Sequence, residues 1–282
     1  MSPQKVYGLI GYPVGHSLSP LMHNAAFAYL KINAQYKLFP LKESEIKVFL
    51  TSLKKENISG LNVTVPYKEK VIPFLASVSK EAELIGAVNT IKVCGDRLEG
   101  FNTDGAGFIK HLSEDLNFNP LNKAIAIIGA GGASRAVSVF LCSNAPKAVS
   151  IFDVDKDKLS VLIDHLKANF KNVLVTAVDS ISRLNIEKSD LLVNETPIGM
   201  KESDPILVDE KFIHKDLLVY DLIYNPAETK LLRLAREKGA RVSNGLGMLL
   251  YQGMLAFEIW TGQIAPKEVM RKALMEGLEN TV

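Results

Sequence analysis

The chain has 282 residues, of which 47% are hydrophobic and 23% charged, so its composition is that of a globular protein and excludes a disordered or collagen-like chain. Its 33 basic and 31 acidic residues leave a formal net charge of +2, which gives no electrostatic reason to expect a nucleic-acid partner. The two cysteines, Cys94 and Cys142, lack metal-ligand spacing, and we expect both to be reduced thiols. No apolar run approaches the roughly 20 residues that cross a bilayer, and no signal-peptide pattern is present, so we expect a cytoplasmic protein without membrane contact.

The first hundred residues predict a small α/β domain of short strands and helices. Ser19 is a typical N-cap residue and proline is favoured at the first helical position, so a helix is expected to start near Pro20. A second, amphipathic helix is expected over 43–55. Strands are expected at 6–10, 36–39, 60–65, 86–93 and 97–101.

A different pattern begins near residue 123, where short apolar strands alternate with helices. Such repeated strand–helix–strand units predict a doubly wound parallel sheet of the Rossmann type. We expect strands at 124–128, 148–152, 173–177, 191–194 and 217–220, and helices at 133–143 and 156–168. Two further helices, at 246–260 and after Pro266, have no sheet of their own and are expected to return to the first domain. The predicted division is 1–102 plus 246–282 for the substrate-binding domain and 103–245 for the nucleotide-binding domain.

A glycine-rich loop follows the first strand of the second domain. Gly129, Gly131 and Gly132 would allow a tight turn and a close approach of the backbone to a pyrophosphate at a helix N-terminus. The motif is incomplete, because Ser134 stands where a third glycine is usual. Asp153 ends the next strand, where a carboxylate binds the ribose 2′-hydroxyl of NAD and would repel the 2′-phosphate of NADP. This spacing favours a dinucleotide site over a plain helix-start turn.

Polar residues in the first domain form three further candidate motifs. Ser17 and Ser19 precede a helix whose free amides favour an anion, although Ser19 could simply cap that helix. Asn62 and Thr64 share one face of a strand by two-residue alternation, and Lys68 lies just past its carboxyl end. A lysine in an arbitrary sequence is nearly always a solvated surface residue, so this spacing alone leaves both interpretations open.

A carboxylate in a later loop offers a partner for the lysine. Asp104 is flanked by Gly105 and Gly107, which suits close approach by a ligand, although Asp104 could also cap the next helix. A lysine and an aspartate from two loops can form an acid–base pair. Asn89 begins a strand, where turn chemistry is the alternative. The five histidines show no paired ligand spacing, so no metal site is expected.

Taken in order, these segments resemble the shikimate dehydrogenase family, and the resemblance covers almost the whole chain. The matching segments are G-Y-P-V-G-H-S-L-S-P-L-M-H-N at 11–24, G-L-N-V-T-V-P-Y-K at 60–68, G-A-V-N-T at 86–90, F-N-T-D-G-x-G-F at 101–108, G-A-G-G-A-S-R-A at 129–136, N-x-T-P-x-G-M at 194–200, D-L-I-Y-N-P-x-x-T at 221–229 and G-x-G-M-L-x-x-Q at 245–252. Several independent matches are more specific than the glycine loop alone. The resemblance implies reversible, metal-free reduction of 3-dehydroshikimate to shikimate with a nicotinamide cofactor, in aromatic amino-acid biosynthesis.

The resemblance also implies roles for individual residues in a cleft between the two domains. Lys68 and Asp104 would be catalytic, at the reacting carbon. Ser17 and Ser19 would bind the substrate carboxylate. The residues expected to hold substrate hydroxyls or position the catalytic pair are Asn62, Thr64, Asn89 and Gln252, with Tyr224 nearby. The residues expected to bind the cofactor are Gly129, Gly131, Gly132, Ala133, Asp153, Thr196 and Gly245.

The choice of cofactor departs from the habit of the family. Many members that use NADP carry an arginine after the second Rossmann strand, whereas this chain reads Asp153-Val154-Asp155-Lys156. The missing arginine and the two carboxylates predict NAD, although Lys156 or Lys158 could still support NADP. Glu195, between Asn194 and Thr196, has no evident role in the motif.

Other functions remain open at this stage. Quinate/shikimate dehydrogenases tend to use NAD, but the Ser17-x-Ser19 form favours shikimate, with quinate as a possible side substrate. A methylene-tetrahydrofolate dehydrogenase would have a similar two-domain shape, yet Ser17, Ser19 and the Lys68–Asp104 pair argue against it. A catalytically silent sensor of nucleotide and a shikimate-like acid is the alternative outside the enzymes. The expected partner is a small-molecule substrate, with the chain a monomer or a homodimer.

Overall fold

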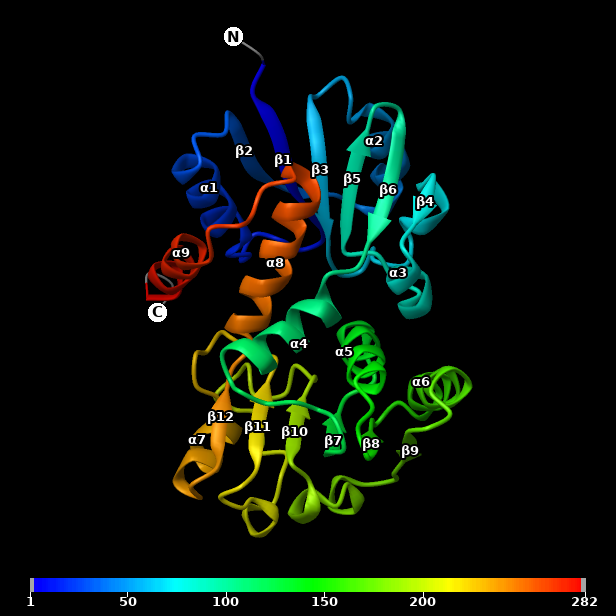
Figure 1. Cartoon of the computed structure of the whole chain (residues 1–282), viewed down its shortest axis with the longest axis vertical. Coiled ribbons are helices and arrows are strands. Elements are labelled where there is room, and N and C mark those ends of the chain that lie inside the picture. The colour runs from blue at the N-terminus through cyan, green and yellow to red at the C-terminus, as the bar shows by residue number, and fades with distance from the viewer. Residues whose placement is uncertain (1–2, 280–282) are drawn as a thin grey trace. The chain divides into compact units, whose positions relative to one another are not determined.

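The computed structural model describes residues 3–279, which form two compact units. Unit 1 comprises Met1–Gly107 and Leu249–Val282, and unit 2 comprises Phe108–Met248. Helices α4 (Asp104–Glu114) and α8 (Leu246–Thr261) each run across one of these divisions (Figure 1). The outermost residues of the expected segments 1–102 and 246–282 lie outside the described residues.

Unit 1 is built on a mixed six-stranded sheet in the order β2-β1-β3-β5-β6-β4. Strand β1 pairs in parallel with β2 and β3, whereas β5 is antiparallel to both β3 and β6. Its strands are β1 (Lys5–Gly11), β2 (Ala34–Pro40), β3 (Ile58–Val63), β4 (Ser77–Val78), β5 (Thr90–Cys94) and β6 (Arg97–Phe101). Strand β3 ends at Val63, two residues before the expected end at residue 65.

The helices of unit 1 are α1 (Ser19–Tyr29), α2 (Ile46–Ser52), α3 (Lys80–Ile85) and α9 (Lys267–Glu279). Helix α9 packs against α1, which confirms that the C-terminal helices return to the first part of the chain. The helix expected over 43–55 is shorter, because a 3₁₀ turn, Glu43–Glu45, precedes α2. The expected strand at 86–93 starts late, since Gly86 ends α3 at a φ of 73°.

The predicted N-cap of helix α1 is wrong. Leu18 is the N-cap residue, Ser19 is the first residue of the helix, and no side chain caps it. Instead, the backbone N–H of Ser19 donates to the Ser17 hydroxyl at 3.2 Å, a local serine turn that ends one residue inside the helix.

Unit 2 contains a wholly parallel six-stranded sheet in the order β12-β11-β10-β7-β8-β9. Its strands are β7 (Ala124–Ile128), β8 (Ala148–Phe152), β9 (Leu174–Ala177), β10 (Leu191–Asn194), β11 (Leu218–Asp221) and β12 (Arg241–Ser243), and its helices are α5 (Gly132–Ser143), α6 (Lys156–Asn169) and α7 (Lys230–Glu237). The chain runs outward from β7 to one edge, then returns to β10 and runs to the other edge (Figure 1). This is the doubly wound, Rossmann-like order that the sequence predicts, and ligands bind such sheets where the order reverses.

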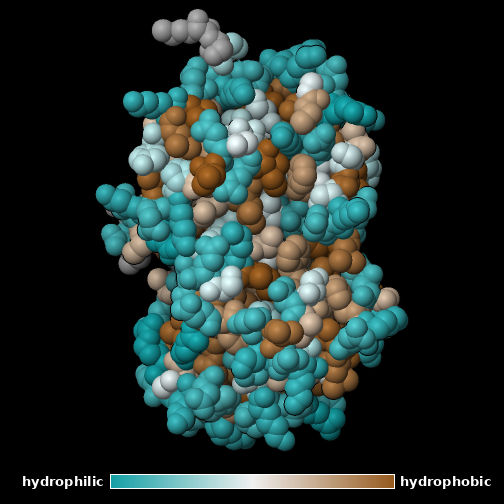
Figure 2. Space-filling model, in the orientation of Figure 1, coloured by the Kyte–Doolittle hydropathy of each residue, from teal (hydrophilic) through white to brown (hydrophobic). Residues whose placement is uncertain are grey.

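No helix within residues 3–279 is long and apolar enough to cross a bilayer. On the face drawn in Figure 2, apolar side chains are interspersed with hydrophilic ones. Single exposed apolar residues of this kind are normal on a protein surface.

Gly60 in β3 provides a test of the packing between the sheet of unit 1 and helix α8. A Cβ atom at this position would lie 2.5 Å from Trp260 Cδ1, and the Trp260 indole is fixed by donating to Ile91 O at 2.9 Å. We therefore expect Gly60→Ala to lower the free energy of unfolding by about 1–3 kcal/mol, measured by urea denaturation.

The matched control is Gly15→Ala, because no atom lies within 4 Å of a Cβ atom at Gly15. This variant should change stability by less than about 0.5 kcal/mol. Equal stabilities for the two variants would contradict the tight packing of Trp260 on β3.

Candidate active site

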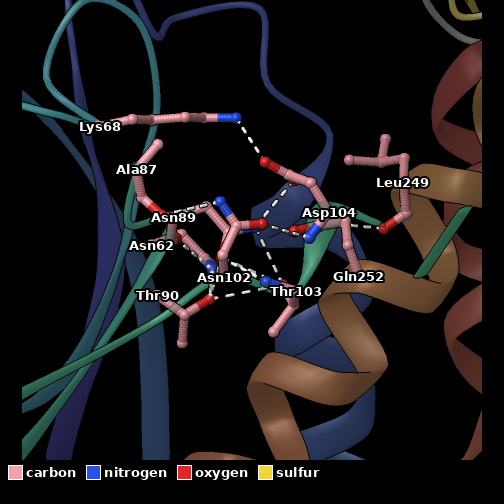
Figure 3. A network of polar contacts seen from close by, with 10 residues as sticks. All are labelled: Asn62, Lys68, Ala87, Asn89, Thr90, Asn102, Thr103, Asp104, Leu249 and Gln252. Carbon is pink, nitrogen blue, oxygen red and sulfur yellow. Dashed lines mark hydrogen bonds and ion pairs between the residues drawn. The ribbon is translucent and has the colours of Figure 1, made fainter. Parts of the chain in front are cut away.

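An ion pair between Lys68 and Asp104 stands at the centre of the polar cluster in unit 1. Lys68 lies in the segment that follows β3, and Asp104 is the first residue of α4. Lys68 Nζ donates to Asp104 Oδ2 at 2.6 Å, and the two side chains are only 19% and 10% exposed (Figure 3). The structure thus brings together the two residues that the sequence suggests as an acid–base pair.

The amide of Asn89 holds the second oxygen of this carboxylate. Asn89 Nδ2 donates to Asp104 Oδ1 at 2.8 Å and to Thr103 Oγ1 at 2.9 Å. Asn89 Oδ1 accepts from the Thr103 backbone N–H at 2.8 Å and from the Thr90 hydroxyl at 2.9 Å. Both amide hydrogens are therefore in use, as is the carbonyl oxygen, so Asn89 is placed to orient Asp104.

Asn62 has one acceptor position left. Asn62 Nδ2 donates to Asn89 O at 3.2 Å and to Thr90 Oγ1 at 3.1 Å, which uses both amide hydrogens. Asn62 Oδ1 accepts one hydrogen bond, from the Tyr36 hydroxyl at 2.8 Å. A carbonyl oxygen has two lone pairs, so Asn62 can still accept a hydrogen bond from a ligand hydroxyl. Thr64, two residues further on, lies just beyond the end of β3 and is half-buried.

Three residues of this network were not expected from the sequence. Thr90 and Thr103 bond the amide of Asn89, while Asn102 Oδ1 accepts from the Asp104 backbone N–H at 3.0 Å and Asn102 Nδ2 donates to Ala87 O at 2.9 Å. All three are at most 6% exposed. The signal was present in the run Asn102-Thr103-Asp104, where two polar residues precede the carboxylate, but only the partner strand β5 reveals their function.

The remaining candidate substrate residues of unit 1 lie on helices. Ser17 and Ser19 lie at the N-terminus of α1, with Ser19 6% exposed. Gln252 lies on α8 and donates to Leu249 O at 2.8 Å (Figure 3). At Gly107 a Cβ atom would lie 2.6 Å from Gln252 N, so this glycine permits the first turn of α4 to approach α8. Tyr224, by contrast, belongs to unit 2, where burial raises the pKa of its phenol.

The glycine loop of unit 2 has the geometry of an anion cradle. Gly129 has a φ of 117°, and at Gly131 and Gly132 a Cβ atom would meet nothing within 4 Å. Gly131 is the N-cap of α5, and no side chain bonds the amides of that first turn, which includes Ala133. Such free amides at a helix N-terminus fit the pyrophosphate of a dinucleotide.

Ser134 explains why the glycine motif can be incomplete. Its hydroxyl donates to Gly129 O at 2.7 Å, and the side chain is fully buried. A serine therefore stands where the third glycine is usual and ties the loop to the helix. In the usual motif the third glycine lets the helix pack closely on the strand. Here the hydrogen bond of Ser134 holds the loop and the helix together instead.

The other candidate cofactor residues follow β10 and β12. The Thr196 hydroxyl donates to Asn194 Oδ1 at 2.8 Å and accepts from the Ile198 backbone N–H at 3.2 Å. At Gly245 a Cβ atom would clash with Leu222 O, so only glycine fits there. Strand β10 is next to β7 in the sheet, which puts Thr196 beside the point where the strand order reverses.

Both oxygens of the Asp153 carboxylate accept hydrogen bonds from the backbone. Its Oδ2 accepts from the Ala130 N–H at 2.5 Å, and its Oδ1 accepts from the Asp155 N–H at 2.7 Å. The carboxylate therefore fixes the glycine loop and the turn after β8. These two hydrogen bonds explain an aspartate at position 153 without any contact to a ribose.

Glu195 is a buried carboxyl group close to the glycine loop. A Cβ atom at Gly129 would lie 3.1 Å from the Glu195 carbonyl carbon, and neither Glu195 carboxyl oxygen has a hydrogen-bond partner. Burial raises the pKa of Glu195 to about 8, against a small opposing effect of the Ser134 hydroxyl, whose proton goes to Gly129 O. Glu195 is therefore neutral at pH 7, which avoids an unpaired charge inside the protein.

Comparison with known proteins identifies the class. Residues 9–91 match the model of the shikimate dehydrogenase substrate binding domain, and residues 245–275 match that of the shikimate 5′-dehydrogenase C-terminal domain. A shikimate dehydrogenase (NADP(+)) of Methanopyrus kandleri is 45% identical over 97% of this chain and 96% of its own length. With its Rossmann-like unit, the protein is thus an oxidoreductase with a nucleotide-binding fold.

Solved structures agree with this assignment. A crystal structure of a shikimate dehydrogenase in complex with NADP+ has a TM-score of 0.91 and 38% identity, covering 98% of this chain and 96% of that one. The enzyme of Listeria monocytogenes, in complex with shikimate and NAD, has a TM-score of 0.90 and 33% identity, covering 97% of both chains. The chain belongs to the shikimate dehydrogenase family.

The expected preference for NAD is wrong. The curated relatives are named as NADP(+) enzymes, and the structure with 38% identity was solved with NADP+. The prediction took Asp153 as a free carboxylate that would repel a 2′-phosphate. Both carboxylate oxygens of Asp153 instead accept backbone hydrogen bonds. The carboxylate therefore faces the glycine loop and the turn after β8.

Within residues 3–279, no group of three or more His, Cys, Asp and Glu side chains is arranged to hold a metal ion.

The buried carboxyl group of Glu195 should make the stability of the protein depend on pH. This carboxyl keeps a proton up to about pH 8 in the folded protein but only to about pH 4.5 when exposed. Between these values the folded state binds more protons than the unfolded state. The free energy of unfolding therefore falls as the pH rises, by at most about 1.4 kcal/mol per pH unit from this group. Glu195→Gln removes this titration with little change of shape.

We expect the wild type to lose more stability between pH 5 and pH 9 than Glu195→Gln, measured by urea unfolding at several pH values. All other titrating groups are common to both proteins, so the difference isolates Glu195. Parallel curves for the two proteins would contradict the buried, neutral carboxyl.

Proposed function

We propose that this protein catalyses the reversible, NADP-dependent reduction of 3-dehydroshikimate to shikimate. The observation that carries the proposal is the Lys68–Asp104 ion pair, joined at 2.6 Å in a largely buried polar cluster. Reduction of a ketone builds negative charge on its oxygen, and a positioned ammonium group can neutralise that charge and supply the proton. The names of the relatives support the substrate and the cofactor.

In this proposal, Lys68 is the proton donor and Asp104 orients it. Lys68 Nζ uses one of its three hydrogens on Asp104 Oδ2, so two remain for a substrate oxygen. Asp104 Oδ1 is held by Asn89, which keeps the carboxylate from rotating away from the lysine. In the oxidative direction the same nitrogen, once neutral, accepts the proton from the hydroxyl of shikimate.

The substrate carboxylate is assigned to the N-terminus of α1. Two hydroxyls, of Ser17 and Ser19, accompany the first amides of an 11-residue helix, and both the amides and the helix dipole favour an anion. Asn62 Oδ1 has a free lone pair for a ring hydroxyl, and Thr64 follows on the same segment. Gln252 completes the proposed set of substrate residues in unit 1, and Tyr224 is the candidate in unit 2.

The residues present in unit 2 fit a dinucleotide. Gly129, Gly131, Gly132 and Ala133 would hold the pyrophosphate against the free amides of α5, while Thr196 and Gly245 would flank the nicotinamide side. When bound, NADPH supplies the hydride for the reduction. Asp153 would support cofactor binding indirectly, because its carboxylate fixes the Ala130 amide in the glycine loop.

Lys156 is our candidate for the 2′-phosphate of NADP. It is exposed, it lies over the Phe152 ring with Nζ 4.8 Å from the ring centroid, and its Nζ donates to Asp153 O at 3.1 Å. Lys158, the other cation of this turn, is paired with Asp155 at 2.8 Å. A carbonyl partner leaves the positive charge of Lys156 unneutralised, which suits a phosphate.

The test of the proposed function is a four-way assay of nicotinamide absorbance. Shikimate and quinate are each offered with NADP+ and with NAD+, and kcat/KM is measured for all four pairs. We expect the highest value for shikimate with NADP+. A preference for quinate would overturn the substrate, a preference for NAD+ would overturn the cofactor, and no turnover by folded protein would overturn the enzyme.

A substitution tests the role assigned to the lysine. Lys68→Ala removes the proton donor but leaves the groups proposed to bind substrate, so we expect kcat to fall by about 10²–10⁴-fold while KM for shikimate changes little. Lys70→Ala is the matched control, because Lys70 lies in the same segment but is exposed and paired with Glu43 at 2.5 Å. A kcat for Lys68→Ala equal to that of Lys70→Ala would remove the lysine from the mechanism.

A further inference from the structure

Tyr36 connects two parts of the proposed substrate site that lie on different elements. It sits in β2, is only 2% exposed, and belongs to no motif by which the sequence indicated the site. Its hydroxyl donates to Asn62 Oδ1 on β3 at 2.8 Å. The Ser19 side chain, at the start of α1, lies close enough to the same phenol to lower its pKa against the larger effect of burial. A single phenol therefore links the proposed carboxylate-binding serine to the proposed hydroxyl-binding asparagine.

The position of Tyr36 is set on both sides of its backbone. The Tyr36 N–H donates to Asn24 Oδ1 at 2.7 Å, and Asn24 Nδ2 donates to Tyr36 O at 3.1 Å. This two-bond contact fixes β2 to helix α1. The His23 ring, on the same helix, stacks on the Tyr36 ring with centroids 4.5 Å apart and an angle of 8° between the planes. The phenol oxygen thus has little freedom to move.

The hydrogen bond from Tyr36 also decides how Asn62 faces a ligand. Both Asn62 amide hydrogens are directed at Asn89 O and Thr90 Oγ1, so the amide can turn its oxygen only towards Tyr36 and the site. The phenol occupies one lone pair of that oxygen and leaves the other for a ligand. Without this donor, a buried acceptor would lose its partner, and the amide would lose one of the bonds that hold its orientation.

We propose that Tyr36 is a positioning residue of the substrate site, which sets the Asn62 carbonyl and the Ser19 hydroxyl for a hydroxylated carboxylic acid. The inference rests on the proposed function, since it assigns Tyr36 to the binding of that substrate. Tyr36 does not contact the catalytic pair, because Asp104 is held by Asn89, and Asn62 and Thr90 stand between Asn89 and the phenol. Loss of the phenol should therefore weaken substrate binding and leave the chemical step nearly intact.

The chain offers a closely matched control in Tyr7. It lies directly beside Tyr36 in the register of β1 and β2, is 1% exposed, and stacks on Phe27 with ring centroids 5.1 Å apart. Burial raises the pKa of its phenol, the nearby Ser59 side chain lowers it, and Tyr7 has no part in the proposed site. Tyr7→Phe and Tyr36→Phe therefore delete the same atom from two buried tyrosines of one sheet.

The experiment measures kcat, the KM for shikimate and the KM for NADP+ for the wild type and both variants, with thermal unfolding as a check of folding. Phenylalanine keeps the stacked ring and the backbone bonds to Asn24, so Tyr36→Phe should fold. We expect it to raise the KM for shikimate about tenfold, equivalent to about 1.4 kcal/mol, with kcat and the KM for NADP+ within about threefold of the wild type. Tyr7→Phe should leave all three constants near the wild-type values.

A double-mutant cycle gives a second, independent readout. If Tyr36 acts through Ser19, the effects of Ser19→Ala and Tyr36→Phe on the KM for shikimate should combine to less than their product. Full multiplicativity would remove that link. Equal KM values for the wild type, Tyr7→Phe and Tyr36→Phe would overturn the inference alone, as would an equal rise in both variants. A wild type that does not turn over shikimate would overturn the proposed function and the inference with it.

Discussion

The arrangement of unit 1 depends on keeping one carboxylate charged in a largely buried place. Asp104 is 7% exposed, and a buried carboxylate is costly unless donors surround it. Lys68 supplies the opposite charge on one oxygen, and Asn89 supplies a neutral donor on the other. The pair is not fully enclosed, since the lysine side chain remains 19% exposed, and the proposed proton transfer requires such access. Burial and access are thereby combined in one contact.

This requirement determines the polar residues around Asp104. For Asn89 to hold the carboxylate, its own amide must be oriented, and Thr90 and Thr103 do this from β5 and the segment before α4. Asn62, on β3, in turn donates a hydrogen bond to the hydroxyl of Thr90. Each polar group satisfies the next, so the network needs no ligand to fix its geometry. A site that is organised before binding loses less entropy when the substrate and the transition state are held.

The sequence predicted the second unit better than the first, for a physical reason. Strands β7, β10 and β11 are buried on nearly their whole length and consist mostly of apolar residues, and β8 alternates between buried and half-buried positions, so their bounds were found within a residue. In unit 1 the elements end at local polar contacts that depend on partners elsewhere. Ser19 became the first helical residue because Ser17 accepts its N–H, a choice that composition does not reveal.

For the candidate site, the sequence indicated the chemical groups, whereas their connections required the fold. Lys68 and Asp104 are 36 residues apart and meet only because the segment after β3 and the start of α4 converge. The supporting Thr90, Asn102 and Thr103 were missed because threonine and asparagine are also common in ordinary turns. Their presence in the sequence therefore does not distinguish a functional site from a turn. Tyr36 could not be recognised at all, since an aromatic residue at the buried position of a strand indicates only core packing until its hydroxyl has a partner.

The failure over the cofactor has the same origin. An acidic residue after the second Rossmann strand argues for NAD only if its carboxylate faces the ribose. In this chain Asp153 instead bonds the Ala130 amide in the glycine loop, while Ser134 bonds Gly129 O in the position where glycine is usual. Asp153 and Ser134 therefore act on the same loop. Each holds the backbone of the glycine loop through a side-chain hydrogen bond. In our proposal the 2′-phosphate is bound by Lys156 on the same turn, whose Nζ donates to a backbone carbonyl and lies over the Phe152 ring.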